Sequence, residues 1–270
     1  MHSVFQAAEG VSSVAIQFVT KTSWPAISAA LPAPAQVFAT ASNFTAKPGA
    51  CLLLPAADGT IALVLFGLED DSAISRDLFR PGRLPGLLPP GLYHFANTPH
   101  DLRLATLAFA LGCYRFGRYR KNEAPKVKLV PPDGIDIADI SRMAEAATLA
   151  RDLINTPSND MGPAELEDAA RTLAARFGAE LTCITGDELL AENFPLIHAV
   201  GMASPRAPRL IDFSWGDPSH PKVTLVGKGV CFDTGGLDLK PSSGMLIMKK
   251  DMGGAANVLA LALMVMDAGL

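Results

Sequence analysis

The amino-acid sequence predicts an α/β fold: a small N-terminal α/β domain, a linker helix, and then the beginning of a larger α/β domain with a mostly parallel central sheet. Short apolar runs bounded by Pro, Gly and Asp, as strands are, alternate with longer segments of helical periodicity. Such alternation favours parallel strands covered by helices. The chain has 270 residues and is 49% hydrophobic, enough for one large core or two ordinary ones.

The first domain is predicted over residues 1–130. Its expected strands are the apolar runs 14–19, 51–54 and 61–66. Four prolines and three glycines make residues 80–91 a predicted loop. A helix is expected over 99–112, where a proline lies near the start and a glycine at the end. Residues 114–119 alternate aromatic and basic side chains, and we interpret them as an aromatic strand with solvated arginines.

A break at Pro131-Pro132-Asp133-Gly134 separates this domain from the rest of the chain. Residues 131–155 are predicted to form a linker that contains a long, Ala-rich connecting helix over 135–154. The second domain is predicted over 156–270. Its expected elements are helix 163–177, strands 180–184, 209–215 and 223–226, and helix 253–266.

Composition argues against several classes of protein. The net charge of -4 and the pI near 5.7 disfavour a nucleic-acid partner or a charged membrane surface. The four cysteines form no C-x-x-C pair and indicate reduced thiols of a cytosolic protein. No signal peptide is recognisable at the start, and the longest apolar stretch, 255–266, is shorter than the roughly 20 residues that span a bilayer. The sequence therefore predicts a cytoplasmic protein with no membrane or nucleic-acid partner.

Four charged residues gather in an otherwise apolar region that contains several glycines: Lys228, Asp233, Lys240 and Asp251. Lys228 follows the predicted strand 223–226, at the strand end where ligands bind in open α/β sheets. Each residue by itself has an ordinary interpretation. These are an ion pair or a phosphate contact for Lys228, a turn cap for Asp233, a solvated surface position for Lys240 and a helix N-cap for Asp251.

Considered together, the four residues predict metal-assisted hydrolysis of a carbonyl compound. Two divalent cations would compensate the clustered charges, since carboxylates are good ligands for hard cations. A lysine amine can also ligate when adjacent cations lower its pKa, and a lysine that is not a ligand can stabilise the oxyanion of a tetrahedral intermediate. The scattered histidines are interpreted as non-ligands; they are His94, His100, His198 and His220.

Two other motifs match the same region less well. A phosphate-binding P-loop needs G-x-x-x-x-G-K-[ST], but here Gly227-Lys228 is followed by Gly229 and the upstream glycine is absent. Asp233-Thr-Gly235 matches the triplet of aspartic proteases, whose mechanism needs two such acids. The chain has one D-T-G, and the nearby lysines fit that mechanism poorly.

The cluster resembles the leucyl aminopeptidase family, also called cytosol aminopeptidases, in the segments Gly227-Lys-Gly-Val-Cys-Phe-Asp-Thr-Gly-Gly-Leu-Asp-Leu-Lys-Pro241 and Met248-Lys-Lys-Asp-Met-Gly-Gly-Ala-Ala256. Asn155-Thr-Pro-Ser-Asn159 and Tyr114-Arg-Phe116 are supporting matches. The resemblance extends from about residue 111 onward. It implies that 156–270 is the first part of a metallopeptidase catalytic domain.

The resemblance also implies roles. Lys228, Asp233 and Asp251 correspond to metal ligands, with Asp233 bridging two ions of Zn²⁺, Mn²⁺ or Mg²⁺. Lys240 corresponds to the catalytic lysine that stabilises the tetrahedral intermediate. Met248 corresponds to a wall of the substrate pocket, and Lys240 and Asp251 also contact substrate. The implied activity is removal of N-terminal, Leu-like residues from peptides, and the implied assembly is a homo-oligomer, commonly a hexamer.

One departure from the family pattern leaves two hypotheses open. The family completes its metal sites from a later Asn-Thr-Asp-Ala-Glu-Gly-Arg motif, whose Arg holds a bicarbonate, and this sequence contains no such segment. The chain is therefore expected to be truncated before that motif and inactive by itself. The first hypothesis is a two-metal aminopeptidase, and the second is a non-catalytic relative that serves as an assembly or regulatory subunit.

Overall fold

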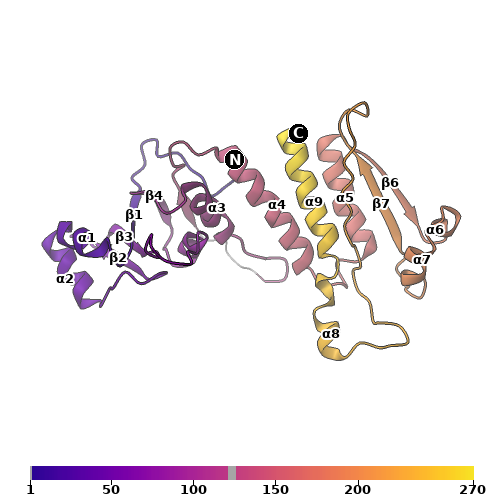
Figure 1. The fold of residues 1–270 in the computed structure, drawn as a ribbon, viewed down its shortest axis with the longest axis horizontal. Coiled ribbons are helices and arrows are strands. Elements are labelled where there is room, and N and C mark those ends of the chain that lie inside the picture. Colours follow the sequence, from indigo (N-terminus) through magenta and orange to yellow (C-terminus); the bar gives the residue numbers. More distant parts are fainter. Residues whose placement is uncertain (1, 121–125) are drawn as a thin grey trace. The chain divides into compact units, whose positions relative to one another are not determined.

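The computed structural model describes residues 2–120 and 126–270, and it divides into two compact units, Met1–Ala144 and Glu145–Leu270 (Figure 1). The division falls inside the predicted linker. The connecting helix α4 (Ile137–Asn155) begins in the first unit and ends in the second. The predicted α/β class is confirmed, and each unit is described by itself below.

The first unit is built on a five-stranded, mostly parallel sheet in the order β2-β3-β1-β4-β5. Its strands are β1 (Val14–Val19), β2 (Cys51–Pro55), β3 (Ile61–Gly67), β4 (Gly91–Phe95) and β5 (Val127–Leu129). Within this sheet, the described pairing of β2 with β3 is antiparallel and the other three are parallel. A mostly parallel sheet is therefore present, but in the first unit, whereas the sequence predicted it in the second domain; the strands described there pair with each other in antiparallel register.

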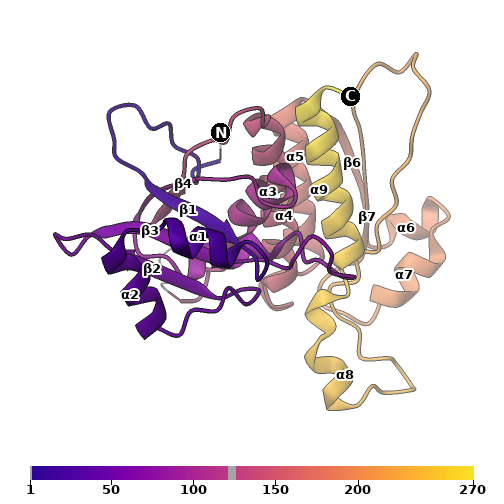
Figure 2. The ribbon, with the colours of Figure 1, turned by 60° about the vertical axis from the view of Figure 1, so that its left-hand side comes forward.

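Alternation along the strands gives this sheet two apolar faces. Phe18 and Phe66 belong to one core together with Phe109 of α3 (Leu102–Gly112), whereas Val19 and Leu65 belong to another core. That second core is completed by partly buried residues of α1 (Trp24–Ala30) and α2 (Ala33–Ala41). Both helices lie against the sheet in Figure 2. Both faces of the sheet are thus covered by helices, as expected for parallel strands.

Two expectations for the first unit were wrong. The predicted loop 80–91 contains a 3₁₀ helix, η1 (Arg80–Gly86), and ends at the first residue of β4. This helix lies close to α3, where a Cβ added to Gly112 would lie 2.0 Å from the carbonyl oxygen of Gly82. The predicted aromatic strand 114–119 is irregular. There the rings of Phe116 and Tyr119 contact each other edge to face, with centroids 6.0 Å apart.

The second unit is formed largely by α-helices and a two-stranded antiparallel sheet (Figure 1). Its longer elements are α5 (Pro163–Phe177), β6 (Glu180–Thr185), β7 (Arg209–Ser214) and α9 (Gly253–Ala268). Its short helices are α6 (Glu188–Ala191), α7 (Pro195–Gly201), α8 (Ser242–Leu246) and η2 (Met248–Lys250). The apolar core joins α4, α5 and α9, and α5 also packs against both strands.

The predicted strand 223–226 is not formed in the structure. The strands described in this unit, β6 and β7, pair with each other in antiparallel register. No described strand lies beside 223–226 to share backbone hydrogen bonds, and Val223 and Val226 are 82% and 88% exposed. Apolar composition alone therefore does not make this segment a strand, because burial and pairing are both missing.

Helix α9 is part of a longer helical stretch than the sequence predicts. Among the described residues, Met248–Ala268 is the one helix whose length and composition would allow it to cross a membrane, and 39% of its most apolar window is buried inside the protein. Met252, Ala256 and Leu263 of this stretch lie in the core of the second unit. We therefore interpret α9 as a core helix, a type of helix that satisfies the same criteria.

Candidate functional site

The candidate site lies where the irregular segment 227–240 meets the first turn of α9. The backbone N–H of Ala255 donates a hydrogen bond to the carbonyl oxygen of Lys228, with a distance of 2.9 Å. Glycine permits this approach: a Cβ on Gly227 would lie 2.7 Å from Cα of Ala255, and one on Gly254 would lie 2.8 Å from the backbone nitrogen of Lys228. The backbone of Lys228 is thus held against the start of α9.

Lys228 forms an ion pair with Asp251. Its Nζ lies 2.8 Å from Oδ2 of Asp251, whose side chain is 19% exposed, whereas that of Lys228 is 62% exposed. Asp251 is positioned by the end of η2, since its backbone N–H donates to the carbonyl oxygen of Met248 at 2.9 Å. The predicted N-cap role is not observed, because α9 begins after Met252 and has no side-chain cap.

Asp233 and Lys240 form a second ion pair across a tight turn. Nζ of Lys240 lies 2.5 Å from Oδ2 of Asp233 and donates to the carbonyl oxygen of the same residue at 3.2 Å. The other carboxylate oxygen accepts from the backbone N–H of Gly235 at 2.6 Å. Gly235 and Gly236 have φ values of +93° and +75°, which favour glycine, so the turn depends on both.

The two ion pairs form one electrostatic cluster. Hydrogen bonding from Lys240 is the largest cause that lowers the pKa of Asp233, followed by the N–H of Gly235, while the positive charge of Lys228 also contributes. Two contacts are observed among the four predicted residues, Lys228 with Asp251 and Lys240 with Asp233, and the positive charge of Lys228 is a minor cause of the lowered pKa of Asp233. Asp233 is accordingly a carboxylate at neutral pH.

Met248 lies beside the amine of Lys240. Its sulfur is 3.7 Å from Nζ of Lys240, and the residue is 7% exposed. Three groups therefore surround the ammonium of Lys240: a carboxylate oxygen, a backbone carbonyl oxygen and a thioether. The thioether is the weakest acceptor of the three.

The two carboxylates of the cluster are oxygen donors of the kind that divalent cations take, and they supply part of a ligand shell. Each carboxylate is neutralised by a lysine ammonium, which occupies a cation position beside the oxygens. Within the described ranges, no group of three or more His, Cys, Asp or Glu could hold a metal ion. Divalent ions of this kind take about four to six ligands each. Asp233, Asp251 and Lys228 are too few to complete two such sites, so further ligands would be needed.

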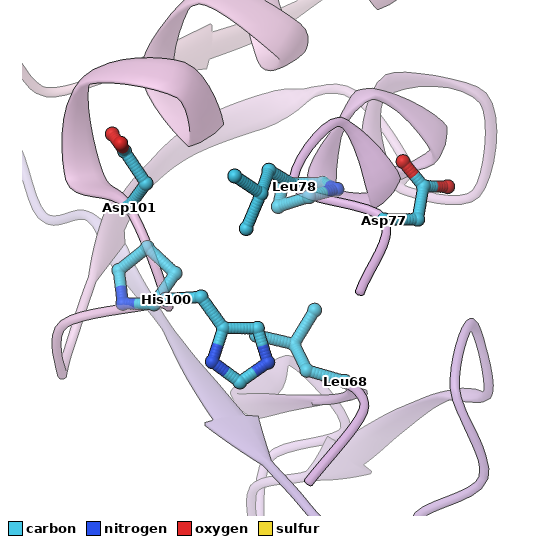
Figure 3. Close-up of a pocket in the computed structure, with 7 residues that line it drawn as sticks. Leu68, Asp77, Leu78, His100 and Asp101 are labelled. Atoms are coloured by element: carbon cyan, nitrogen blue, oxygen red, sulfur yellow. The ribbon is translucent and has the colours of Figure 1, made fainter. Parts of the chain in front are cut away.

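The histidines lie elsewhere. His94 bonds to the hydroxyl of Ser13, and His198 pairs with Asp187. His100 lies in the first unit with Nδ1 3.1 Å from Asp71, and its buried Nε2 has no partner among the described atoms. It borders a shallow hollow (Figure 3), where the carboxylates of Asp77 and Asp101 point away from the imidazole ring. His100, Asp77 and Asp101 therefore do not converge as the ligands of a metal ion would.

Sequence reasoning did not single out three charged residues of the second unit that make long-range contacts, Lys249, Arg206 and Glu165. The side chain of Lys249 donates to the carbonyl oxygen of Asn155 at 3.2 Å. Arg206 donates to the carbonyl oxygen of Ser158 at 2.8 Å and pairs with Glu165. The sequence did contain a signal for Glu165. It lies three residues after Gly162 at the start of a helix, which is the spacing of a capping box.

The fold and the cluster define a class: a two-unit α/β protein whose second unit carries two lysine–aspartate ion pairs. Two family models match the chain, "Cytosol aminopeptidase family, catalytic domain" over residues 148–270 and "M17 aminopeptidase, N-terminal domain" over residues 14–132. The chain therefore belongs to the cytosol aminopeptidase family, and the resemblance predicted from its motifs is confirmed.

Individual relatives agree with this membership. A "Probable cytosol aminopeptidase" of Leifsonia xyli subsp. xyli is 35% identical over 240 residues, which are 83% of this chain and 48% of that protein. The crystal structure of cytosol aminopeptidase from Coxiella burnetii is 40% identical with a TM-score of 0.91, covering 99% of this chain and 58% of that one. The bottromycin maturation enzyme BotP, in complex with Mn, is 29% identical with a TM-score of 0.77, covering 96% of this chain and 57% of that one. The chain thus spans about half the length of the relatives it matches.

Proposed function

We propose that the intact protein is a two-metal aminopeptidase that hydrolyses the N-terminal peptide bond of peptides, with preference for Leu-like residues. The observation that carries the proposal is the presence of two lysine–aspartate ion pairs, Lys228 with Asp251 and Lys240 with Asp233. Family membership supports the aminopeptidase activity, and the Mn complex of BotP supports dependence on a divalent ion. Zn²⁺, Mn²⁺ and Mg²⁺ are the candidate ions.

Asp233, Asp251 and the neutral amine of Lys228 would hold the ions, with further ligands from outside the described residues. Divalent ions, when bound, would supply Lewis-acid activation of water and of the scissile carbonyl. Asp233 is suited to bridging, because each of its two oxygens accepts a separate hydrogen bond, one from Lys240 and one from the N–H of Gly235. Asp251 would additionally face the substrate amine.

Lys240 would stabilise the negative charge that develops on the substrate carbonyl oxygen. Its ammonium now contacts Asp233 twice and Met248 once, which occupies all three of its donors. A substrate oxygen would replace the Met248 sulfur most easily, since that contact is the weakest. Met248 would then remain next to the scissile bond and form a wall for the N-terminal side chain.

The proposals for location, assembly and bicarbonate binding rest on family membership alone. We expect a cytoplasmic homo-oligomer, with a hexamer as the expected form, that acts on peptides. Bicarbonate is an expected additional cofactor, bound by residues outside the described part of the chain. The word "cytosol" in the names of relatives supports the location.

Hydrolysis of leucine p-nitroanilide by the intact protein tests the activity. Asp233→Asn keeps the shape of the side chain but removes its charge, so activity should fall by at least a hundredfold. Asp238→Asn is the matched control, because Asp238 is an exposed carboxylate five positions away and should leave the rate unchanged. Equal rates for the two variants would rule out the proposed role of Asp233.

A non-catalytic relative remains the second candidate. It is favoured by the donor set of the described residues, in which lysines neutralise both carboxylates and no third acid or histidine joins them. Such a subunit should co-purify with assembled copies or partners and should hydrolyse no aminoacyl anilide at any concentration of Mn²⁺ or Zn²⁺. Metal-dependent turnover by the intact protein would exclude it.

A further inference from the structure

A second group of charged residues lies beside the candidate site and belongs to none of its proposed roles. It is centred on Arg206, in the loop that precedes β7. The guanidinium donates to the carbonyl oxygens of Ser158 and Asn159 at 2.8 and 3.2 Å. It also pairs with the carboxylate of Glu165 in the first turn of α5. One planar side chain thus ties the Asn155–Asn159 segment to the start of a helix.

Glycine at position 162 is required for this arrangement. A Cβ added there would lie 2.2 Å from Cζ of Arg206 and 2.4 and 2.5 Å from its two terminal nitrogens. The guanidinium therefore rests directly on the backbone of Gly162. The N–H of Gly162 donates to the carboxylate of Glu165 at 2.9 Å, so the same carboxylate caps α5 and accepts from Arg206.

The first turn of α5 in turn supports the segment that carries the proposed ligands. A Cβ on Gly229 would lie 3.3 Å from the Leu166 side chain and 3.6 Å from that of Ala255, so the backbone at 229 runs between α5 and α9. Cys231 is 6% exposed and belongs to the same core as Leu166. Burial raises the pKa of the Cys231 thiol to about 11, and the charges of Arg206 and Glu165 act on it as smaller causes.

We propose that Arg206 is a positioning residue for the metal ligands. By holding Gly162 and Glu165, it fixes the start of α5 against residues 229–231. This segment lies between Lys228 and Asp233 in the chain, so its position fixes both proposed ligands. The inference rests on the proposed function for its metal-binding consequence. Arg206 itself contacts neither proposed ligand in the structure. Gly162 is part of the same arrangement, because a side chain at this position would displace the guanidinium of Arg206.

The test compares Arg206→Ala, Gly162→Ala and their combination in the intact protein. Removing a residue that orients metal ligands typically weakens metal binding 10–100-fold, so each single variant should raise the Kd for Mn²⁺ about tenfold in calorimetry. The double variant should raise it no further, because both changes remove the same contact. Arg206→Lys, which keeps one charge but not the planar fork, should give an intermediate value.

Arg176→Ala is the matched control. Arg176 lies in the last turn of α5 and pairs with Glu145, so its loss removes an ion pair from the same helix at the opposite end. It should lower the melting temperature as Arg206→Ala does, yet leave the Kd for Mn²⁺ unchanged. Unchanged Mn²⁺ affinity in both Arg206→Ala and Gly162→Ala, or effects that add in the double variant, would overturn the proposal.

Amide hydrogen exchange on metal-free protein separates this proposal from the proposed function. Protection at residues 229–233 should fall in Arg206→Ala and Gly162→Ala and persist in Arg176→Ala. A wild-type protein that binds no Mn²⁺ would refute the proposed function, while exchange would still decide whether Arg206 positions this segment. A wild-type protein that binds Mn²⁺, with unchanged exchange in both variants, would refute the positioning role alone.

Discussion

Replacement of Lys240 by Met should separate catalysis from stability. The Lys240–Asp233 pair is partly exposed, with side-chain exposures of 31% and 39%, so its loss should change the free energy of unfolding by less than about 1 kcal/mol. Asp233 keeps its hydrogen bond from the N–H of Gly235. The lost donor to a developing oxyanion, by contrast, should lower kcat by a factor of about 10²–10³, or about 3–4 kcal/mol.

The assay is steady-state hydrolysis of leucine p-nitroanilide by the intact protein, paired with thermal unfolding. Because Lys240 acts on charge that develops in the transition state, kcat should fall while KM changes little. Lys250→Met removes an exposed lysine near the site and provides the control. A kcat within threefold of wild type in Lys240→Met, with the control also unchanged, would refute the role given to Lys240.

Further predictions concern the core, the acid range and the metal. Met248→Ala should cost about 2 kcal/mol of stability, because the side chain is buried, and should alter the relative kcat/KM for Leu and Ala anilides; unchanged preference would remove Met248 from the pocket. Gly112→Ala should cost about 1–3 kcal/mol in denaturant unfolding, because its Cβ would lie 2.0 Å from the Gly82 carbonyl oxygen; wild-type stability would show that η1 can move away freely. Burial acts to raise the pKa of Glu167, but hydrogen bonds from Arg209 and Arg171 outweigh it and lower the pKa below its ordinary value of 4.5. The unfolded chain therefore binds more protons than the folded protein in the acid range, and the free energy of unfolding should fall as the pH drops below about 4.5. Glu167→Gln should make this fall with pH less steep. Chelation should abolish activity and added Mn²⁺ should restore it, whereas persistent activity in the chelated protein would exclude a metal mechanism.

The sequence predicted elements well where local pattern and burial agree. Strand 14–19 and helix 163–177 have the expected bounds, because apolar alternation and the Pro163–Gly178 boundaries act within the segment itself. Strands 114–119 and 223–226 were wrong for a common reason. A strand needs a partner for its backbone groups, and composition carries no information on whether one lies alongside.

In the candidate site, too, the local features could be predicted from the sequence, but the long-range contacts could not. Clustering of Lys228, Asp233, Lys240 and Asp251 follows from glycine-bearing turns that are visible in the sequence. Which lysine pairs with which carboxylate could not be predicted, because it depends on the approach of the segment around Lys228 to the start of α9. Arg206 was invisible for a similar reason: its partners lie 41 to 48 positions away along the chain.

Metal content of the intact protein tests the central proposal most directly. Wild-type protein, equilibrated with Mn²⁺ and passed through a desalting column, should retain two ions per chain by mass spectrometry of the metal. Asp233→Asn should retain at most one, because the bridging carboxylate is lost, and Asp238→Asn should retain two. Two retained ions in Asp233→Asn, or none in wild type, would contradict the assignment of this cluster as a two-metal site.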